Sequence, residues 1–297
     1  IQIMITPNQV SLIIPTYNRQ EIVFQTLQYI KQQSISGFEV VLVDQTESND
    51  SNLNNFKDDG FKYKYLKIKE TGLPNARNVG AENAKGDILI FIDDDSIPDS
   101  DLIQSYMNLF NDYEKDKFCI GGRIIEKNTT MFKENNSIVG GWITWYGKTL
   151  KNFDTVKSGE CEWASGGNFG LTKDLFIEAG GFDPNFIGTA VLEDGDFGYA
   201  VKKIGGRVYY YPEPVIEHLR IPTGGVRQKN PAKGMFYRAH NTVYFFRKYG
   251  RRRFLCFVFV YLNGIAMKEW VKQKHGLSSF IWTWIGFYKG LITKLNK

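Results

Sequence analysis

The chain has 297 residues, 42% of them hydrophobic and 23% charged, with a formal net charge of +5. This length allows one large α/β domain, or a domain with an extension. The three widely spaced cysteines exclude a zinc site and a disulfide framework, and they favour a reducing compartment. The opening residues, IQIMITPNQV, lack the basic start and the apolar core of a signal peptide.

The first half of the chain alternates apolar runs with helical patterns. Strands are predicted at residues 10–15, 38–43, 63–68 and 88–92, and helices at residues 20–33 and 74–84. The short connections predict right-handed parallel βαβ units. Polar residues follow three of the strands, at Thr16, Asp44 and Asp93. Because the carboxyl ends of parallel strands meet at one edge, we expect these side chains to converge there, as a nucleotide site requires.

The stretch GDILIFIDDDSIP, residues 86–98, carries the strongest chemical signal. Its apolar run predicts a strand buried on both faces, and the run ends in Asp93, Asp94 and Asp95. Three adjacent carboxylates repel one another unless a cation lies among them, and hard divalent cations take such oxygen ligands. The stretch therefore predicts a metal–diphosphate site at the tip of a central strand. The alternative is an acidic turn that faces water.

The second half predicts shorter elements. Helices are expected at residues 99–113, 174–179 and 193–204, strands at 118–126, 207–211 and 215–217, and two short strands around Gly166 and Gly167. Residues 128–158 show little periodicity and predict loops with short strands. The helix at 193–204 opens with three acids, Glu193, Asp194 and Asp196.

The charge is unevenly distributed along the chain. Residues 218–297 contain 16 Lys and Arg against the single acid Glu269, a net charge of +15, whereas residues 1–217 carry 21 basic and 31 acidic residues, a net charge of −10. A basic tail on an acidic body predicts an anionic partner for the tail. Phospholipid, a lipid-linked phosphate or nucleic acid would each serve.

The tail predicts three helical segments. The first covers residues 234–249, and the second, an apolar run at 254–267, is too short to span a bilayer comfortably. In the third, residues 277–295, a Trp-containing apolar stripe is flanked by Lys289, Lys294 and Lys297, which is typical of a helix that lies on an anionic membrane. The alternatives are a helix packed on the catalytic body or in a dimer interface.

Six blocks of the sequence resemble a known family. They are, in order, VSLIIPTYNR, VDQTES, GLPNARNVG, FIDDDSIP, SGGNFG and LEDGDFGYAVKKIGGRVYYYPEPVIEH. Over about residues 10–218 they resemble the family-2 inverting glycosyltransferases, which implies an α/β GT-A fold with a mostly parallel central sheet flanked by helices. The expected organisation is a catalytic domain at 1–218, with a nucleotide-sugar half at about 1–126 and an acceptor half at about 127–218. A basic loop and C-terminal amphipathic helices follow at 219–297.

The resemblance implies residues that hold the donor nucleotide. Pro15, Thr16, Tyr17 and Arg19 match positions lining the nucleotide pocket; a helix-capping turn is the alternative. Asp44 matches an acid that accepts a hydrogen bond from N3–H of a pyrimidine base, which suits an acceptor-only carboxylate. Gln45 stands where the family often has a second acid, which makes the base less certain.

Further matches concern the phosphates and the metal ion. Arg77 matches a helix residue directed at the nucleotide or its phosphates, the alternative being a solvated helix face. Asp93 and Asp94 match ribose-binding positions, Asp95 matches the metal ligand of the DxD signature, and His218 matches a histidine that completes the metal shell. The implied cofactor is Mn²⁺ or Mg²⁺, and an imidazole ligand favours Mn²⁺.

The remaining matches concern the transfer itself. Asp194 matches the general base of the family's ED motif; the alternative is that Glu193 and Asp194 only cap their helix. Substrate or acceptor contacts are implied for Glu193, Gly166, Gly167, Asn168 and Trp163, although buried tryptophans are more often core. A loop at 220–234 is expected to close over the diphosphate with Arg220, Arg227 or Lys229; a flexible linker is the alternative.

The sequence therefore predicts a metal-dependent inverting glycosyltransferase. It would move a sugar from a UDP- or dTDP-sugar to a hydroxyl of a glycan or lipid-linked acceptor. The expected location is the cytoplasm, at the inner face of the cell membrane, and no nucleic-acid partner is expected. A homodimer through the C-terminal helices is the alternative to membrane contact. One rival is a sugar nucleotidyltransferase, but IIPTYNRQE lacks the Gly-rich triphosphate loop that such an enzyme needs. The other rival is a non-catalytic, membrane-associated nucleotide-binding protein.

Overall fold

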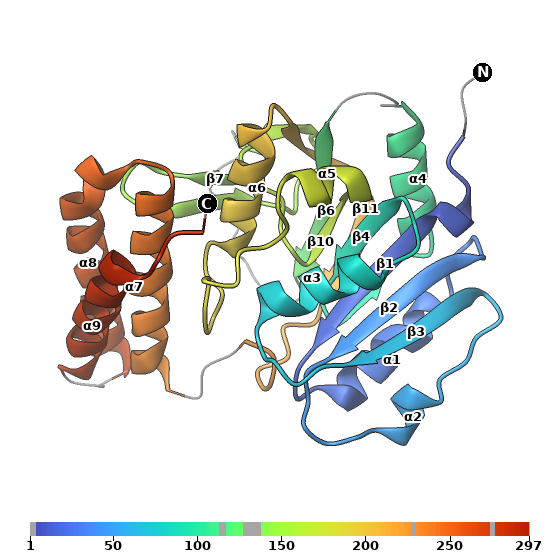
Figure 1. Cartoon of the computed structure of the whole chain (residues 1–297), viewed down its shortest axis with the longest axis horizontal. Coiled ribbons are helices and arrows are strands. Elements are labelled where there is room, and N and C mark those ends of the chain that lie inside the picture. Colours follow the sequence, from blue (N-terminus) through green and yellow to red (C-terminus); the bar gives the residue numbers. More distant parts are fainter. Residues whose placement is uncertain (1–3, 113–116, 127–137, 227–229, 274–276, 297) are drawn as a thin grey trace.

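The computed structural model describes residues 4–112, 117–126, 138–226, 230–273 and 277–296. Within them, a nine-stranded sheet has the order β3-β2-β1-β4-β10-β6-β11-β5, and β9 pairs with β11. Helices cover its faces (Figure 1), and a β7–β8 hairpin forms a second sheet that is bridged to the residues after β9 by Gly141 and Trp163. The strands are β1 Val10–Thr16, β2 Phe38–Asp44, β3 Phe61–Lys67, β4 Ile88–Ile92, β5 Ser96–Pro98, β6 Phe118–Glu126, β7 Gly140–Ile143, β8 Thr149–Asn152, β9 Gly159–Cys161, β10 Asn168–Thr172 and β11 Arg207–His218. The α-helices are α1 Gln20–Ile30, α2 Ser51–Asn54, α3 Leu73–Asn83, α4 Leu102–Asp112, α5 Lys173–Glu178, α6 Glu193–Lys203, α7 Pro231–Lys248, α8 Leu255–Gln273 and α9 Ser278–Ile292.

Strands β1 to β4 form the parallel part of the sheet. β1 pairs in parallel with both β2 and β4, and β2 pairs in parallel with β3. Every residue of β1, β2 and β4 is buried, as their apolar runs predict. Because the strands are parallel, Thr16, Asp44 and Asp93 all lie at one edge of the sheet.

The other part of the sheet brings His218, at the end of β11, to that same edge. β10 runs antiparallel between β4 and β6, and β11 pairs in parallel with β6. The two strands predicted at 207–211 and 215–217 are one strand, with a register shift between Tyr210 and Val215. Pro212 and Pro214 lie in this interval, and their lack of an N–H explains the shift. At the far end of β11, His218 pairs with Ser96 of β5, directly beside Asp95.

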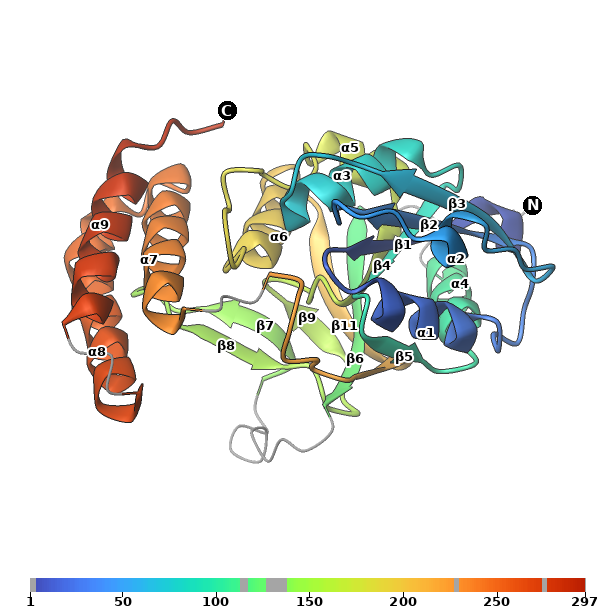
Figure 2. The same cartoon turned by 90° about the horizontal axis from the view of Figure 1, so that it is seen from below.

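The helices α7, α8 and α9 stand at the end of the molecule opposite the N-terminus (Figures 1 and 2). A buried ionic network joins them to α6. Lys248 Nζ lies 2.8 Å from Asp196 Oδ2 and 2.9 Å from Asp183 Oδ2. Tyr249 donates its hydroxyl to Asp196 Oδ1 at 2.9 Å. Burial raises the pKa of Asp196 to about 6 despite the nearby Lys248. Through its contacts with Lys248 and Tyr249, Asp196 links α6 to the C-terminal helices.

Helix α9 packs on α7 through small residues rather than through its apolar stripe. The buried positions of α9 are Ser279, Thr283, Gly286 and Gly290. Small side chains at this spacing let two helix backbones approach closely. Much of the predicted stripe is exposed instead, with exposed fractions of 52% at Ile281, 55% at Trp284, 63% at Tyr288 and 55% at Ile292. Two other members of the stripe, Phe280 and Phe287, pack against aromatic rings of α8.

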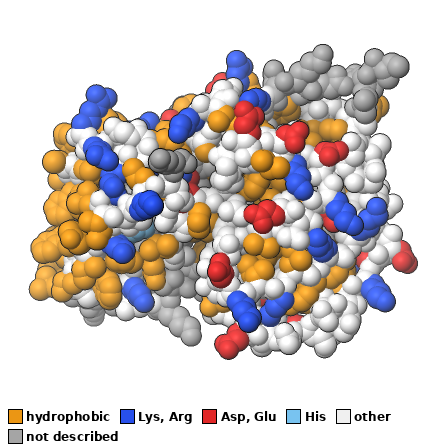
Figure 3. Space-filling model, in the orientation of Figure 1, with side chains coloured by type: hydrophobic (Ala, Val, Ile, Leu, Met, Phe, Trp, Pro, Cys, Tyr) orange, Lys and Arg blue, Asp and Glu red, His pale blue; other side chains and the backbone are white. Residues whose placement is uncertain are grey.

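Helix α8 adds to the same apolar surface. Phe257, Val260 and Val271 are 53%, 69% and 72% exposed, and in Figure 3 hydrophobic side chains gather over this end of the molecule. By length and composition alone, the helical segment Arg252–Lys272 can cross a membrane, which the sequence did not predict. Only 17% of its most apolar 18-residue stretch is buried, unlike that of a core helix. We call the exposed apolar residues of α8 and α9 the outer face.

A substitution at the α7–α9 contact tests this packing. A Cβ added to Gly286 would lie 2.2 Å from the carbonyl oxygen of Phe236, whereas a Cβ at Gly264 of α8 would meet nothing within 4 Å. We expect Gly286→Ala to lower the free energy of unfolding by about 1–3 kcal/mol because the helices must separate. Gly264→Ala should raise it by about 0.5–1 kcal/mol. Equal effects of the two variants in urea unfolding would contradict the packing.

Candidate functional site

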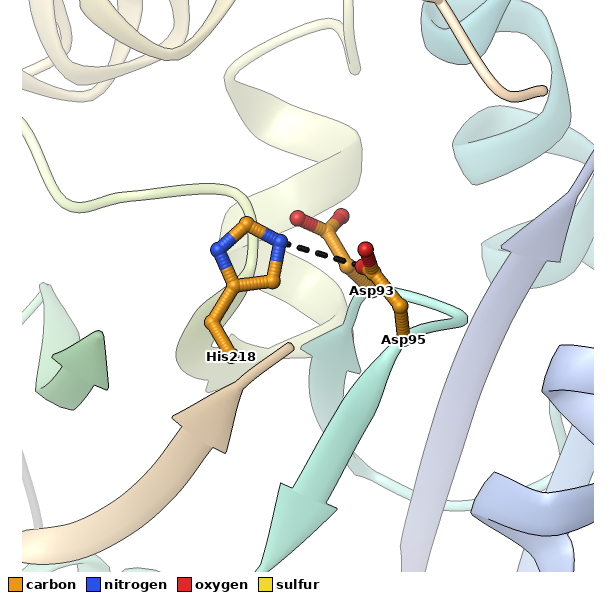
Figure 4. Close-up of side chains that lie close together, drawn as sticks. All are labelled: Asp93, Asp95 and His218. Atoms are coloured by element: carbon orange, nitrogen blue, oxygen red, sulfur yellow. Dashed lines mark hydrogen bonds and ion pairs between the residues drawn. The ribbon is translucent and has the colours of Figure 1, made fainter. Parts of the chain in front are cut away.

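Two carboxylates and an imidazole meet at the carboxyl edge of the sheet. Asp93 follows β4, Asp95 precedes β5, and His218 ends β11. One ligand atom of each lies within 4.8 Å of those of the other two, and His218 Nε2 is 3.0 Å from Asp95 Oδ1 (Figure 4). Asp95 also accepts a hydrogen bond from the Ile221 N–H at 2.9 Å.

This cluster fits a divalent cation. Neighbouring ligand atoms of an octahedral ion with bonds of 2.0–2.1 Å lie about 2.9 Å apart, close to the 3.0 Å between Asp95 and His218. Burial opposes the charge of Asp95, but its contacts with His218, Arg19 and the Ile221 N–H lower its pKa, which suits a candidate metal ligand. The mixed oxygen and nitrogen donor set suits Mn²⁺.

Asp94 turns away from this cluster toward Arg19. Its carboxylate accepts hydrogen bonds from Arg19 Nη1 and Thr16 Oγ1, both at 2.8 Å. Burial raises the pKa of Asp94 to about 6, although Arg19 opposes the rise. Arg19 also donates to the carbonyl oxygens of Ile221 and Thr223, at 2.8 and 2.7 Å. It thus fastens the loop after β11 against the acidic residues.

A cavity of about 480 Å³ opens beside these groups. The structure brings eight of the predicted site residues together in its wall: Pro15, Thr16, Tyr17, Arg19, Asp93, Asp94, Asp95 and His218. The sequence reading missed Gly72, Gly188 and Tyr237, which also line it. Tyr237 comes from α7, so the C-terminal helices contribute to the cavity, and no local sequence signal indicates this.

Asp44 lies at the same edge of the sheet but is enclosed. Its Oδ2 accepts hydrogen bonds from Gln20 and Tyr65 at 2.8 Å and lies 3.2 Å from Lys67 Nζ. Burial opposes its charge, but hydrogen bonds from Thr46, Tyr65 and Gln20 lower its pKa. Its side chain has no exposed surface, so the predicted contact with a base requires one of these partners to move. Gln45, by contrast, lines the cavity.

Arg77 connects the metal cluster to the predicted base. It is 2% exposed, on α3. Its Nη1 lies 3.2 Å from both Glu193 Oε1 and Asp194 Oδ1, and its Nη2 lies 3.5 Å from Asp93 Oδ1. The predicted contact of Arg77 with the nucleotide is not seen in the cavity wall; its partners are the three carboxylates.

Burial governs the ionisation of the two acids on α6. It raises the pKa of Asp194, while Arg77 and the Gly166 N–H lower it in part. Burial and the neighbouring Asp194 raise the pKa of Glu193 well above its usual range. Burial thus opposes the charge of both acids, and Arg77 is the cation that offsets this for each of them. Buried carboxyl groups with raised pKa values beside a cation are typical of acid–base sites.

The glycine pair of the SGGNFG block makes room for these charges. A Cβ at Gly166 would lie 2.2 Å from Arg77 Nη2 and 2.4 Å from Asp194 Oδ1. A Cβ at Gly167 would lie 2.7 Å from Asp93 Oδ2. The groups that lie closest to these two glycines are therefore protein side chains, and their predicted contact with substrate stays a prediction.

Two predicted substrate residues lie in the core. Asn168 is fully buried, accepts from the Tyr106 hydroxyl at 2.8 Å and donates to the carbonyl oxygens of Arg123 and Pro214. Trp163 is 8% exposed and packs edge-on against Phe153. In this conformation both hold the sheet together and neither lines the cavity.

The predicted phosphate loop is described only in part. Arg220 forms an ion pair with Glu126 and lines a second cavity of about 290 Å³ on the other side of Asp93 and His218. Gly225 donates its N–H to the Tyr17 carbonyl oxygen at 2.8 Å, which closes the loop over the site. Arg227 and Lys229 lie outside the described residues.

Comparisons with known proteins agree with this architecture. A family model described as "Glycosyl transferase family 2" matches residues 11–179. The chain is 26% identical over 238 residues to the chondroitin synthase of Escherichia coli, covering 69% of this chain and 34% of that protein. It is 26% identical over 186 residues to the GalNAc(5)-diNAcBac-PP-undecaprenol beta-1,3-glucosyltransferase of Campylobacter jejuni, covering 61% and 56%. The chain thus spans between about a third and just over half of these curated relatives.

A solved structure extends the likeness to the fold. The crystal structure of GalNAc-T7 with UDP, GalNAc and Mn²⁺ matches with a TM-score of 0.61 at 19% identity, over 80% of this chain and 47% of that one.

The metal cluster makes a direct prediction. Asp95→Asn removes a charged ligand, so we expect Mn²⁺ affinity, measured by calorimetry, to fall at least tenfold. Asp101→Asn, at an exposed acid outside the cluster, should change it less than twofold. If Asp95→Asn remains folded in a thermal melt and binds Mn²⁺ like the wild type, the cluster is not a metal site.

Proposed function

Because the chain belongs to glycosyl transferase family 2 and has the GT-A fold, we propose that it transfers a sugar from a nucleotide-diphosphate donor to an acceptor hydroxyl, with inversion at the anomeric carbon. The observation that carries this proposal is the bridge made by Arg77. It links Asp93, at the wall of a nucleotide-sized cavity, to Asp194, the candidate base. A candidate leaving-group site and a candidate proton acceptor thus contact the same guanidinium.

Inversion follows from a single in-line displacement. The acceptor oxygen forms a bond to the anomeric carbon as the bond from that carbon to the diphosphate oxygen breaks. The bonding pair leaves with the nucleoside diphosphate, and Asp194 takes the proton of the acceptor hydroxyl. Arg77 keeps Asp194 ionised until then by lowering a pKa that burial raises.

Asp93, Asp95 and His218 would hold Mn²⁺ or Mg²⁺. When bound, the ion neutralises charge that develops on the diphosphate leaving group. Arg19 holds the loop 221–225 over this position through its contacts with Ile221 and Thr223, which excludes water from the reacting groups.

We propose UDP or dTDP as the leaving group and a glycan or lipid-linked hydroxyl as the acceptor. The crystallised relative was solved with UDP, and the C. jejuni relative is named for an undecaprenol-linked acceptor. Asp44 remains our candidate for base recognition, provided that the side chain of Gln20 or Lys67 moves away from its carboxylate. The two alternatives, a sugar nucleotidyltransferase and a non-catalytic protein, explain the acid pair Glu193 and Asp194 and the family match less well.

We also propose that the outer face of α8 and α9 rests on the inner face of the cell membrane. Its large apolar residues point outward while small residues pack inward, the reverse of a soluble helix. Arg253 and Lys268 bracket 14 uncharged residues on α8, and residues 277–288 on α9 are 12 uncharged residues. At 1.5 Å per residue these runs measure about 21 and 18 Å, shorter than a bilayer core, which favours helices lying in the interface.

The base assignment is tested by Asp194→Asn, which keeps the shape but removes the proton acceptor. We expect kcat to fall about 10²–10⁴-fold. Binding of UDP with Mn²⁺ should stay within about threefold, since Asp194 does not line the cavity. A variant that transfers sugar at the wild-type rate removes Asp194 from this role.

The membrane proposal is tested by two matched isoleucines. Ile281→Gln on the outer face should weaken binding to anionic vesicles about tenfold, because an apolar side chain leaves the lipid. Ile177→Gln on α5, where the isoleucine is 64% exposed, should have little effect. Unchanged binding of Ile281→Gln, together with dimers in sedimentation, would assign the face to a second copy of the chain.

A further inference from the structure

A third pocket, distinct from the nucleotide cavity and from the cavity lined by Arg220, lies where the sheet domain meets the outer face. It has a volume of about 520 Å³ and is formed by the β7–β8 turn and the corner between α7 and α8. Its lining includes Ile143 and Trp145 from the turn region and Tyr249, Arg251, Arg253 and Phe254 from the corner. It shares no residue with the nucleotide cavity, and nothing in the proposed transfer uses it.

The pocket is cationic. Arg251 and Arg253 are the charged residues in its wall. Among the described residues neither forms an ion pair with a carboxylate. Two nearby acids do not line the pocket and have other partners: Glu162 accepts from the Ile143 N–H and the Tyr199 hydroxyl, and Asp196 accepts from Tyr249. Two arginines without acidic partners predict an anionic ligand.

Aromatic rings hold both guanidinium groups in place. Arg251 lies 5.0 Å from the centre of the Tyr199 ring and donates to its hydroxyl at 2.9 Å. Arg253 lies 4.8 Å from the centre of the Phe254 ring. A guanidinium held against a ring is pre-ordered, and the N–H groups of Arg253 together with those of Arg251 that do not bind Tyr199 suit a phosphate.

The rim of the pocket continues into the outer face. Trp145, which is 49% exposed, packs against Phe254 at 5.7 Å and against Phe257 at 4.8 Å between ring centres. Phe257 belongs to the exposed apolar surface of α8. A ligand held by the arginines would therefore extend an apolar chain onto that surface, so the ligand that fits is amphipathic.

The pocket also adjoins the helix that carries the candidate base. Tyr199 lies five residues after Asp194 on α6, about 7.5 Å along the helix at 1.5 Å per residue. The tyrosine that holds Arg251 and the candidate base therefore belong to the same helix.

We propose that this pocket binds the phosphate or diphosphate group of a membrane lipid, with the lipid chain on the outer face. The inference deepens the proposed function and rests on it, because the lipid that we expect in this pocket is the lipid-linked acceptor of the proposed reaction. A phospholipid headgroup offers the same phosphate chemistry, and the two sources are separable by experiment.

The test compares two adjacent arginines. Arg253 lines the pocket, whereas Arg252 is exposed beside it and does not. Binding of the full chain is measured on neutral phosphatidylcholine vesicles carrying a small fraction of polyprenyl diphosphate, and on vesicles of matched charge made with phosphatidylglycerol. Donor and metal ion are left out, so a failure of lipid binding stays distinct from a failure of sugar transfer.

On the diphosphate vesicles we expect Arg253→Gln to bind about tenfold more weakly and Arg252→Gln to stay within twofold. On phosphatidylglycerol both should lose affinity equally, as for any surface cation. If the difference appears on phosphatidylglycerol instead, the pocket still binds a lipid phosphate but the acceptor is not its source. Equal losses on both vesicles, or no wild-type binding to either, would overturn the proposal. Arg251→Gln, checked for folding by its melting temperature, should behave like Arg253→Gln.

Discussion

The site depends on one buried cation. Arg77 contacts carboxylates that belong to separate parts of the chain, Asp93 after β4 and Glu193 and Asp194 at the start of α6. Without it, three acids would share a poorly solvated space at a high electrostatic cost. Because Arg77 lies between them, the nucleotide side and the acid–base side of the site are fixed relative to each other. Gly166 and Gly167 permit this arrangement by leaving room for the charged groups.

Much of the sheet and of the cavity wall could be predicted because the signals are local. The apolar run at 88–92 predicts strand β4 with both ends correct. The acids that follow it lie where the parallel strands end. The partners of Arg77 could not be predicted, since they lie 116 and 117 residues further along the chain and depend on how α6 is placed. The enclosure of Asp44 by Gln20, Tyr65 and Lys67 is likewise a product of tertiary contacts.

The C-terminal helices show a different limit of prediction from sequence. Periodicity correctly predicted that one side of α9 is apolar, but it cannot tell whether that side meets protein or solvent. The small residues Gly286 and Gly290 decide the matter, because they allow closer contact with α7 than the large apolar side chains do. Through Lys248 these helices are tied to Asp196 on α6, so the outer face, the lipid-phosphate pocket and the candidate base belong to one connected unit.

The central claim is that Arg77 keeps Asp194 ionised, and the pH dependence of transfer measures this most directly. Asp194 acts only when deprotonated, so the rate should fall as the pH drops through its pKa, which burial raises and Arg77 lowers. In Arg77→Gln the acid limb of the kcat profile should move up by about one pH unit or more, while Arg77→Lys should keep it near the wild-type position. An acid limb that stays in place when the charge of Arg77 is removed would contradict the account.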